Sequence, residues 1–252
     1  MSYRDIVVHV DEQPGSQARA TFAAEFARRF GAELTGVFLE SDLIYNYAGA
    51  ELLAYMPPEE IDRLLKEHAA AVHKASEKAR MTFEAAIAAA SVKCEWLTTQ
   101  GERSEPMARL ARHYDLTIFP VNATATYGMH RITAAGLALA SGGPVLVPQE
   151  GVSAAVGHRV LVAWKGTRES ARALRDAWPL IEKAESVHVL KVSPQGEDGP
   201  EHLLQRHFER HGRAVEVIVD RSDDLAASDV IRRHVQAIGA DLLVMGVYGR
   251  PR

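Results

Sequence analysis

Residues 158–192 read HRVLVAWKGTRESARALRDAWPLIEKAESVHVLKV, and the order of features in this stretch decides the fold. A short β-branched run comes first and is followed by a polar turn. A stretch with helical periodicity comes next, and a second β-branched run ends the segment. Strands that alternate with helices in this way predict a parallel sheet that is covered by helices.

The same order of features occurs near the N-terminus, where residues 4–40 read RDIVVHVDEQPGSQARATFAAEFARRFGAELTGVFLE. Both helical stretches carry an Ala-Arg-Ala core, at Ala18–Ala20 and at Ala171–Ala173. Further along, YDLTIFPV around Asp115 matches ADLLVMGV around Asp241. A repeat longer than about one hundred residues indicates a duplicated domain rather than a solenoid.

The predicted fold is therefore α/β, with two tandem open parallel-sheet domains of the Rossmann-like type and helices on both sheet faces. The predicted domains are residues 1–150 and 158–252, joined by a linker at 151–157. In the first half we expect strands at 5–10, 33–39, 92–98, 116–121 and 144–148, and helices at 16–30, 59–90, 104–113 and 130–141. In the second half we expect strands at 158–164, 186–192, 214–220 and 241–246, and helices at 167–183, 200–211 and 224–238.

The second copy is shorter than the first at its C-terminal end. It has no counterpart of Arg131–Pro148, the last helix and last strand of the first copy. Its sheet should have one strand fewer, so that an inner strand becomes an edge with unpaired backbone groups. We expect either that the natural chain continues past Arg252, or that another chain or the first half covers this edge.

The composition of the 252 residues is that of a globular protein, with 47% hydrophobic and 25% charged residues. The net charge of −4 argues against a nucleic-acid surface or a basic membrane face. The apolar runs are too short for a membrane span. Cys94 is the single cysteine, so an intrachain disulfide is impossible and a reducing cytoplasm is indicated. We expect Cys94 to lie in the core of the sheet.

Ligands of open parallel sheets bind outside the carboxyl ends of the strands, where the strand order reverses. The sharpest candidate there is the loop Gly246-Val-Tyr-Gly249-Arg250, which follows the last apolar run. Glycines let the backbone approach a ligand, successive N–H groups form an anion nest, and Arg250 adds a cation. The alternative is a tight turn that needs its glycines for shape alone.

Few other motifs suggest chemistry. The segment His207-Phe-Glu-Arg-His211 places two imidazoles one helical turn apart, which is a spacing for two metal ligands, but no third ligand is evident. A polar helix face is the alternative. No Walker loop, Rossmann glycine motif or Ser/His/Asp arrangement stands out. The sequence therefore predicts neither catalytic nor metal-binding residues.

The repeated segments resemble the universal stress protein family. In the second half the resemblance lies in RVLVAWKGTRESARAL and GADLLVMGVYGR, and in the first half in IVVHVDEQPGS, DLTIFPV and SGGPVLVP. It covers nearly the whole chain as two tandem domains. The resemblance implies a five-stranded parallel sheet, a cytoplasmic location, a role in the stress response and a homodimer.

In the family members that bind ATP, an aspartate after the first strand contacts the sugar or base, and a loop G-x2-G-x9-G-[S/T] holds the phosphates. The first half has the aspartate as Asp11, but its loop NATATYG lacks the first glycine pair. The second half has the pair as Gly246 and Gly249, with Lys165 in place of the aspartate. The resemblance thus implies nucleotide-binding roles for Gly246 and Gly249, and for Asp11 in the first half. Lys165 and Arg250 would add two positive charges near the same cleft, which suits phosphate; the alternative is that Lys165 is solvated or paired with a surface acid.

Three functions follow from these observations. The first is a non-enzymatic stress-response module that binds ATP or another adenine nucleotide, with Mg²⁺, through the second glycine loop. The second is an interaction protein whose two sites are both degenerate and which acts through dimerisation or partner binding. The third is a weak ATPase. None of them has nucleic acid or a membrane as a partner.

Overall fold

A computed structural model describes residues 2–41, 55–100, 104–125, 131–149, 151–193 and 199–247. The chain divides into two compact units, Ser2–Ala154 and Ala155–Arg252. The boundary between the units falls inside the segment 151–157. Each unit is described by itself below.

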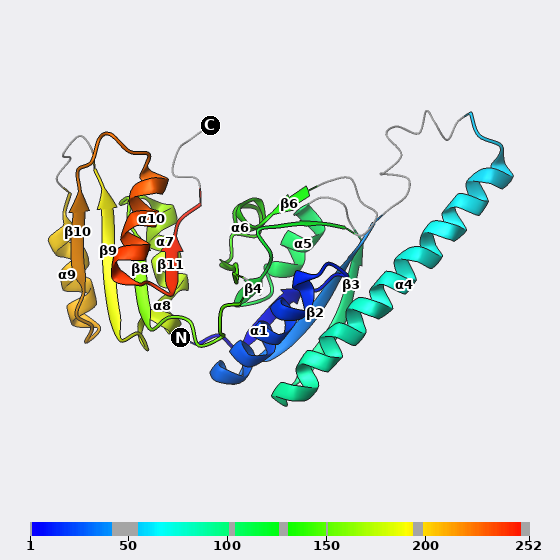
Figure 1. The fold of residues 1–252 in the computed structure, drawn as a ribbon, viewed down its shortest axis with the longest axis horizontal. Coiled ribbons are helices and arrows are strands. Elements are labelled where there is room, and N and C mark those ends of the chain that lie inside the picture. The colour runs from blue at the N-terminus through cyan, green and yellow to red at the C-terminus, as the bar shows by residue number, and fades with distance from the viewer. Residues whose placement is uncertain are drawn as a thin grey trace. The chain divides into compact units, whose positions relative to one another are not determined.

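The first unit is a parallel sheet with helices on both faces (Figure 1). The strand order is β3-β2-β1-β4-β7. Helix α1 packs against α4, and α5 packs against α6. Since crossover connections are right-handed, these two pairs cover opposite faces of the sheet. The elements are β1 (Asp5–His9), α1 (Gly15–Phe30), β2 (Glu33–Glu40), α4 (Pro58–Ala90), β3 (Cys94–Gln100), α5 (Ser104–Ala111), β4 (Leu116–Ile118), β5 (Asn122–Thr124), β6 (Arg131–Thr133), α6 (Ala134–Ser141) and β7 (Val145–Leu146).

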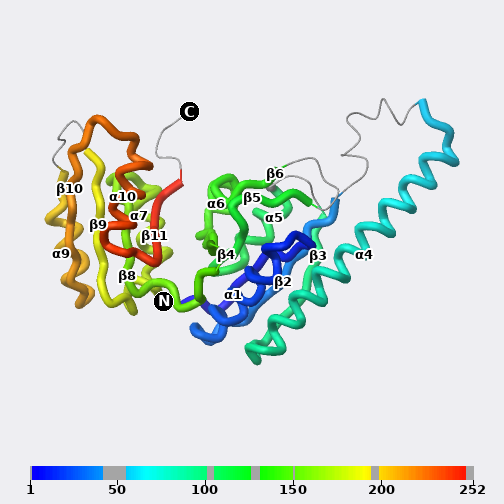
Figure 2. Tube along the Cα trace, viewed as in Figure 1, coloured from blue at the N-terminus to red at the C-terminus, as the bar shows by residue number. Residues whose placement is uncertain are grey.

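The second unit contains a four-stranded parallel sheet in the described residues, with the order β10-β9-β8-β11 (Figure 2). The order of its four strands matches that of β3-β2-β1-β4 in the first unit, and β11 forms the edge where the first sheet adds β7. The elements are β8 (Arg159–Ala163), α7 (Arg168–Asp176), α8 (Trp178–Ile181), β9 (Ser186–Val192), α9 (Glu201–Arg210), β10 (Glu216–Asp220), α10 (Ala227–Ile238) and β11 (Leu242–Met245).

The two repeated aspartates have the same structural role in their sheets. Asp115 precedes β4, and its Oδ2 accepts hydrogen bonds from the backbone N–H groups of Arg4 and Asp5, at 2.7 and 3.1 Å. Asp241 precedes β11, and its carboxylate accepts from three N–H groups at residues 157–159, at distances of 2.9–3.2 Å. Each carboxylate therefore joins the starts of two neighbouring strands that are distant in sequence.

The segment after β4 contains more regular secondary structure than the sequence predicts. Residues 122–128 were expected to be a loop and 130–141 a helix, but β5 and β6 form an antiparallel pair there, and α6 begins only at Ala134. The pair is held by apolar burial, because Ala123 and Ile132 point into the core. The helix start is fixed by Thr133, whose hydroxyl accepts from the Gly136 N–H at 2.9 Å.

Two further predictions are wrong in detail. The helix expected at 167–183 is divided into α7 and α8, because Pro179 has no N–H to continue the helical ladder. Cys94, expected in the core, is exposed. The reason is that Cys94 begins β3, which is an edge strand whose residues are mostly exposed.

Candidate functional site

The strand order of each sheet reverses at one place, and the predicted site residues lie near these places. In the first sheet the reversal falls between β1 and β4, and in the second it falls between β8 and β11. Asp11 follows β1, Lys165 follows β8, and Gly246 follows β11. All three are therefore at carboxyl ends of strands, where open parallel sheets bind ligands.

Asp11 is buried and paired within its own unit. Its Oδ1 accepts from Arg19 Nη2 at 3.2 Å and from the Gln13 N–H at 3.2 Å, and its Oδ2 lies 3.7 Å from His9 Nδ1. The residue is only 7% exposed. The carboxylate that the sequence assigns to a nucleotide is thus occupied by an arginine of the protein.

Arg19 is the part of this site that the sequence interpretation missed. It lies on the buried face of α1 with Phe22 and Phe26, and its Nε donates to the His9 carbonyl at 2.7 Å. Burial lowers the pKa of Arg19, but an arginine in a protein stays protonated. The signal was present in the sequence, because a lone arginine in an apolar helical stripe requires a buried counter-charge.

His9 is the third member of the cluster. The residue is fully buried, and its ring centroid lies 5.0 Å from that of Phe119. Burial lowers the pKa of His9 to about 4, because a charged imidazole is costly away from water, and Asp11 only partly opposes this effect. At neutral pH the cluster therefore contains one cation, one anion and a neutral imidazole.

This histidine should make the stability of the first unit sensitive to acid. The pKa of an unfolded histidine is 6.5, so the unfolded chain binds more protons than the folded chain between pH 6.5 and 4. Stability is complete above this window and is lost as the pH falls through it. The expected loss from His9 is about 2 kcal/mol between pH 7 and pH 5, and about 3 kcal/mol by pH 4.

The test is urea unfolding of the full chain at several pH values. His9→Gln should remove the loss that wild type shows between pH 6.5 and 4, because glutamine does not titrate. His113→Gln, which changes an exposed histidine of the same unit, is the control and should keep the loss. If the wild-type and His9→Gln curves run parallel through this window, His9 does not remain neutral in the folded state.

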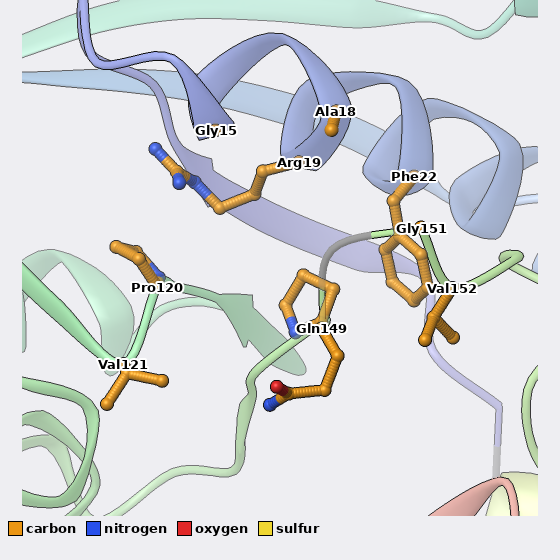
Figure 3. A pocket seen from close by; sticks show the side chains of 10 residues that line it. Gly15, Ala18, Arg19, Phe22, Pro120, Val121, Gln149, Gly151 and Val152 are labelled. Carbon is orange, nitrogen blue, oxygen red and sulfur yellow. The ribbon is translucent and has the colours of Figure 1, made fainter.

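A small cavity lies beside Arg19 (Figure 3). Its volume is about 200 Å³, and Nη1 of Arg19 makes no hydrogen bond to any described residue. Typical ligand pockets measure roughly 300–1,000 Å³, so this cavity is too small for a whole nucleotide. Its lining comes from α1, from the segment after β4 and from the segment after β7, and consists of Gly15, Ala18, Arg19, Phe22, Pro120, Val121, Pro148, Gln149, Gly151 and Val152.

In the second unit, Lys165 lies on the surface just after β8. It is exposed, and it makes no ion pair with any described residue. Gly166 follows with a φ of +72°, and Thr167 then caps α7 by a reciprocal capping box with Ser170. The turn therefore places Lys165 two residues before the N-cap of α7.

Gly246 is a glycine because of a close approach between backbones. Met245 pairs with Ala163 in the sheet, so the chain leaves β11 beside the end of β8. A Cβ on Gly246 would lie 2.7 Å from the Glu169 carbonyl carbon and 2.8 Å from the Ser170 nitrogen, in the first turn of α7. The structure thus brings Lys165 and Gly246 together at the carboxyl ends of the neighbouring strands β8 and β11. Gly249 and Arg250 lie outside the described residues. Asp11 belongs to the other unit.

Asp220, at the end of β10, is fully committed to local hydrogen bonds. Its carboxylate accepts from Ser222 Oγ at 2.6 Å, from His234 Nε2 at 2.7 Å and from Arg233 Nη2 at 2.7 Å. These donors hold its pKa well below the usual range for an aspartate.

Across the part of the chain that the structure describes, no three His, Cys, Asp or Glu side chains gather as metal ligands. No helix in the same residues is long and apolar enough to cross a membrane.

Comparison with known proteins matches the first part of the chain to a family. A model of the universal stress protein family matches residues 2–123. A universal stress protein structure from Archaeoglobus fulgidus DSM 4304 is 16% identical, covers 95% of this chain and 85% of its own, and has a TM-score of 0.67. Residues 2–123 therefore match the universal stress protein family, and the fold of parallel sheets flanked by helices is the fold of the solved universal stress proteins.

Two other solved structures are similar to the chain, and no curated protein matches it. A protein described as a universal stress protein from Pseudomonas aeruginosa UCBPP-PA14 is 15% identical, covers 99% of this chain and 84% of its own, and has a TM-score of 0.51. A universal stress protein in complex with cAMP is 15% identical and covers 59% of this chain and 99% of its own, with a TM-score of 0.38. The cAMP is a ligand of that protein.

Proposed function

We propose that the chain is a tandem universal stress protein, a cytoplasmic stress-response module whose second unit binds ATP or another adenine nucleotide without catalysing its turnover. One observation supports this proposal. Lys165 and Gly246 follow the C-terminal ends of β8 and β11, the neighbouring parallel strands between which the strand order reverses. That position is the general ligand position of open α/β sheets. Gly246 also lies against the first turn of α7.

Two sources of positive potential support a phosphate at this edge. The Lys165 ammonium is exposed and has no ion-pair partner among the described residues. The N-terminal end of α7 adds the positive end of a helix dipole, which attracts anions. Gly249 and Arg250 would extend the same phosphate loop, and Mg²⁺ would accompany the phosphates of ATP.

The first unit is assigned a structural role in this proposal. Asp11 would have to leave Arg19 to bind a ligand, and breaking a buried ion pair typically costs about 3–5 kcal/mol. The cavity beside Arg19 is also too small for a nucleotide. We therefore place the nucleotide in the second unit alone.

Calorimetric titration of Mg-ATP into the full chain tests the proposal. We expect saturable binding of about one nucleotide per chain. Lys165→Gln should weaken binding by about tenfold, because it removes one charge-assisted contact to phosphate. Lys183→Gln, another exposed lysine of the same unit, should leave the affinity unchanged. Absence of heat at millimolar nucleotide, or equal affinity of wild type and Lys165→Gln, would reject the site.

A second candidate function, self-association, is favoured by the edge strand β11. Within the described residues no strand pairs with its outer edge, and Leu243 and Met245 are 37% and 53% exposed. The unpaired backbone groups of an edge strand are a template for a strand of a second copy, which would produce a homodimer. Sedimentation over a wide concentration range tests this function, and a monomer throughout would exclude it.

A further inference from the structure

We propose that His207 and His211 form a two-histidine site for a divalent transition metal, which binds Cu²⁺ most tightly and Zn²⁺ and Ni²⁺ more weakly. The site lies at the C-terminal end of α9 and is independent of the proposed nucleotide site. Imidazole is a preferred ligand of all three ions, and copper comes first in the general order of affinities.

The structure brings the two imidazole rings together. His207 and His211 are one helical turn apart, and their ring centroids are separated by 4.7 Å. Trp178 of α8 contacts both rings, with centroid distances of 5.7 Å to His207 and 4.8 Å to His211. The fully buried Phe208 fixes this turn of α9 against the unit. His207 therefore lies in the last turn of α9 and His211 is its C-cap residue, and both rings contact Trp178.

The separation of the rings fits coordination of one ion by both. A ring nitrogen binds such metals at about 2.0–2.1 Å, which places the metal about 3.2 Å from the ring centroid. Two rings whose centroids are 4.7 Å apart are close enough for both to reach a single ion. Because both side chains are exposed, they can rotate to direct one nitrogen each at the ion.

The charges around the pair act on a metal cation in opposite directions. The nearby Arg175 and Arg210 oppose the cation, whereas the carbonyl end of α9 attracts it. Water would complete the coordination shell, since the described residues supply no third ligand. These features indicate a site of moderate affinity.

Titration of CuSO₄ into the full chain, in a buffer that does not chelate, tests the site. We expect saturable heat together with quenching of tryptophan fluorescence, because Trp178 contacts both ligands. Trp178→Phe should remove most of the quenching and keep the heat. His207→Gln and His211→Gln should each weaken binding by at least tenfold. His202→Gln is the matched control, an exposed histidine on the same helix, and should not change the affinity.

Two results would overturn the proposal. One is the absence of saturable Cu²⁺ binding below 1 mM, a limit that is about the weak end of specific binding. The other is an unchanged affinity in both His207→Gln and His211→Gln, which would place the copper elsewhere on the chain. Circular dichroism of each variant establishes that the fold is intact, so that a lost affinity reports the lost ligand.

Discussion

Replacing Arg19 with methionine is expected to lower the free energy of unfolding of the first unit by about 3–5 kcal/mol. Methionine keeps the apolar contacts of the side-chain stem but leaves Asp11 as a buried carboxylate without its cation. The His9 carbonyl also loses the hydrogen bond from Nε. An unpaired buried charge is much more costly than a missing ion pair, which is why the single replacement is severe.

The measurement is urea unfolding of the full chain, followed by the fluorescence of Trp96 in a Trp164→Phe, Trp178→Phe background. Trp96 packs against Phe83 and reports on the first unit. The double variant Asp11→Asn, Arg19→Met removes both charges and should recover most of the lost stability. A loss below about 1 kcal/mol for Arg19→Met would mean that the pair behaves like an exposed ion pair.

Gly246→Ala is expected to destabilise the second unit by about 3 kcal/mol, which is the upper end of the usual cost of overpacking. The new Cβ would meet the backbone of Glu169 and Ser170, and backbone atoms in a capped helical turn cannot rotate away as a side chain can. Either β11 or α7 must move, and both carry buried residues.

Gly199→Ala is the matched control in the same unit. A Cβ at Gly199 would meet only the ends of the Glu201 and Lys191 side chains, which can move, so a change within about 0.5 kcal/mol is expected. Unfolding without any nucleotide is the decisive measurement. Equal stability of Gly246→Ala and wild type would show that Gly246 is not required for packing, and would leave ligand contact as the reason for the glycine.

The sequence predicted the fold class because each strand and most helices have their own local pattern. The runs near 5–10, 33–39 and 186–192 are short and β-branched, and the structure has strands there. The β5–β6 pair was not predicted, since its three-residue strands are too short to produce a period of two. Pro179 indicated that the expected helix at 167–183 is interrupted. The interruption was not predicted, because the apolar periodicity continues past the proline.

The site was less predictable, because its properties depend on contacts between distant segments. Asp11 could be placed after a strand, but its pairing with Arg19 depends on where α1 turns its buried face. Gly246 was predicted to belong to a phosphate-binding loop, with a tight turn as the alternative. The contact of Gly246 with Glu169 and Ser170 depends on how β11 meets α7, some 76 residues earlier in the chain. Local patterns in the sequence contain no information about such approaches.

The long-range hydrogen bonds of Asp115 and Asp241 have a consequence for the synthesis of the protein. Asp115 bonds to backbone groups 110 and 111 residues earlier, and Asp241 to groups 82–84 residues earlier. At about 5–20 residues per second, the ribosome makes β1 roughly 5–20 s before the chain that closes its sheet. During that interval the apolar edge of β1 has no neighbouring β4. The edge of β1 that faces β4 therefore stays unpaired until residue 118 has been synthesised.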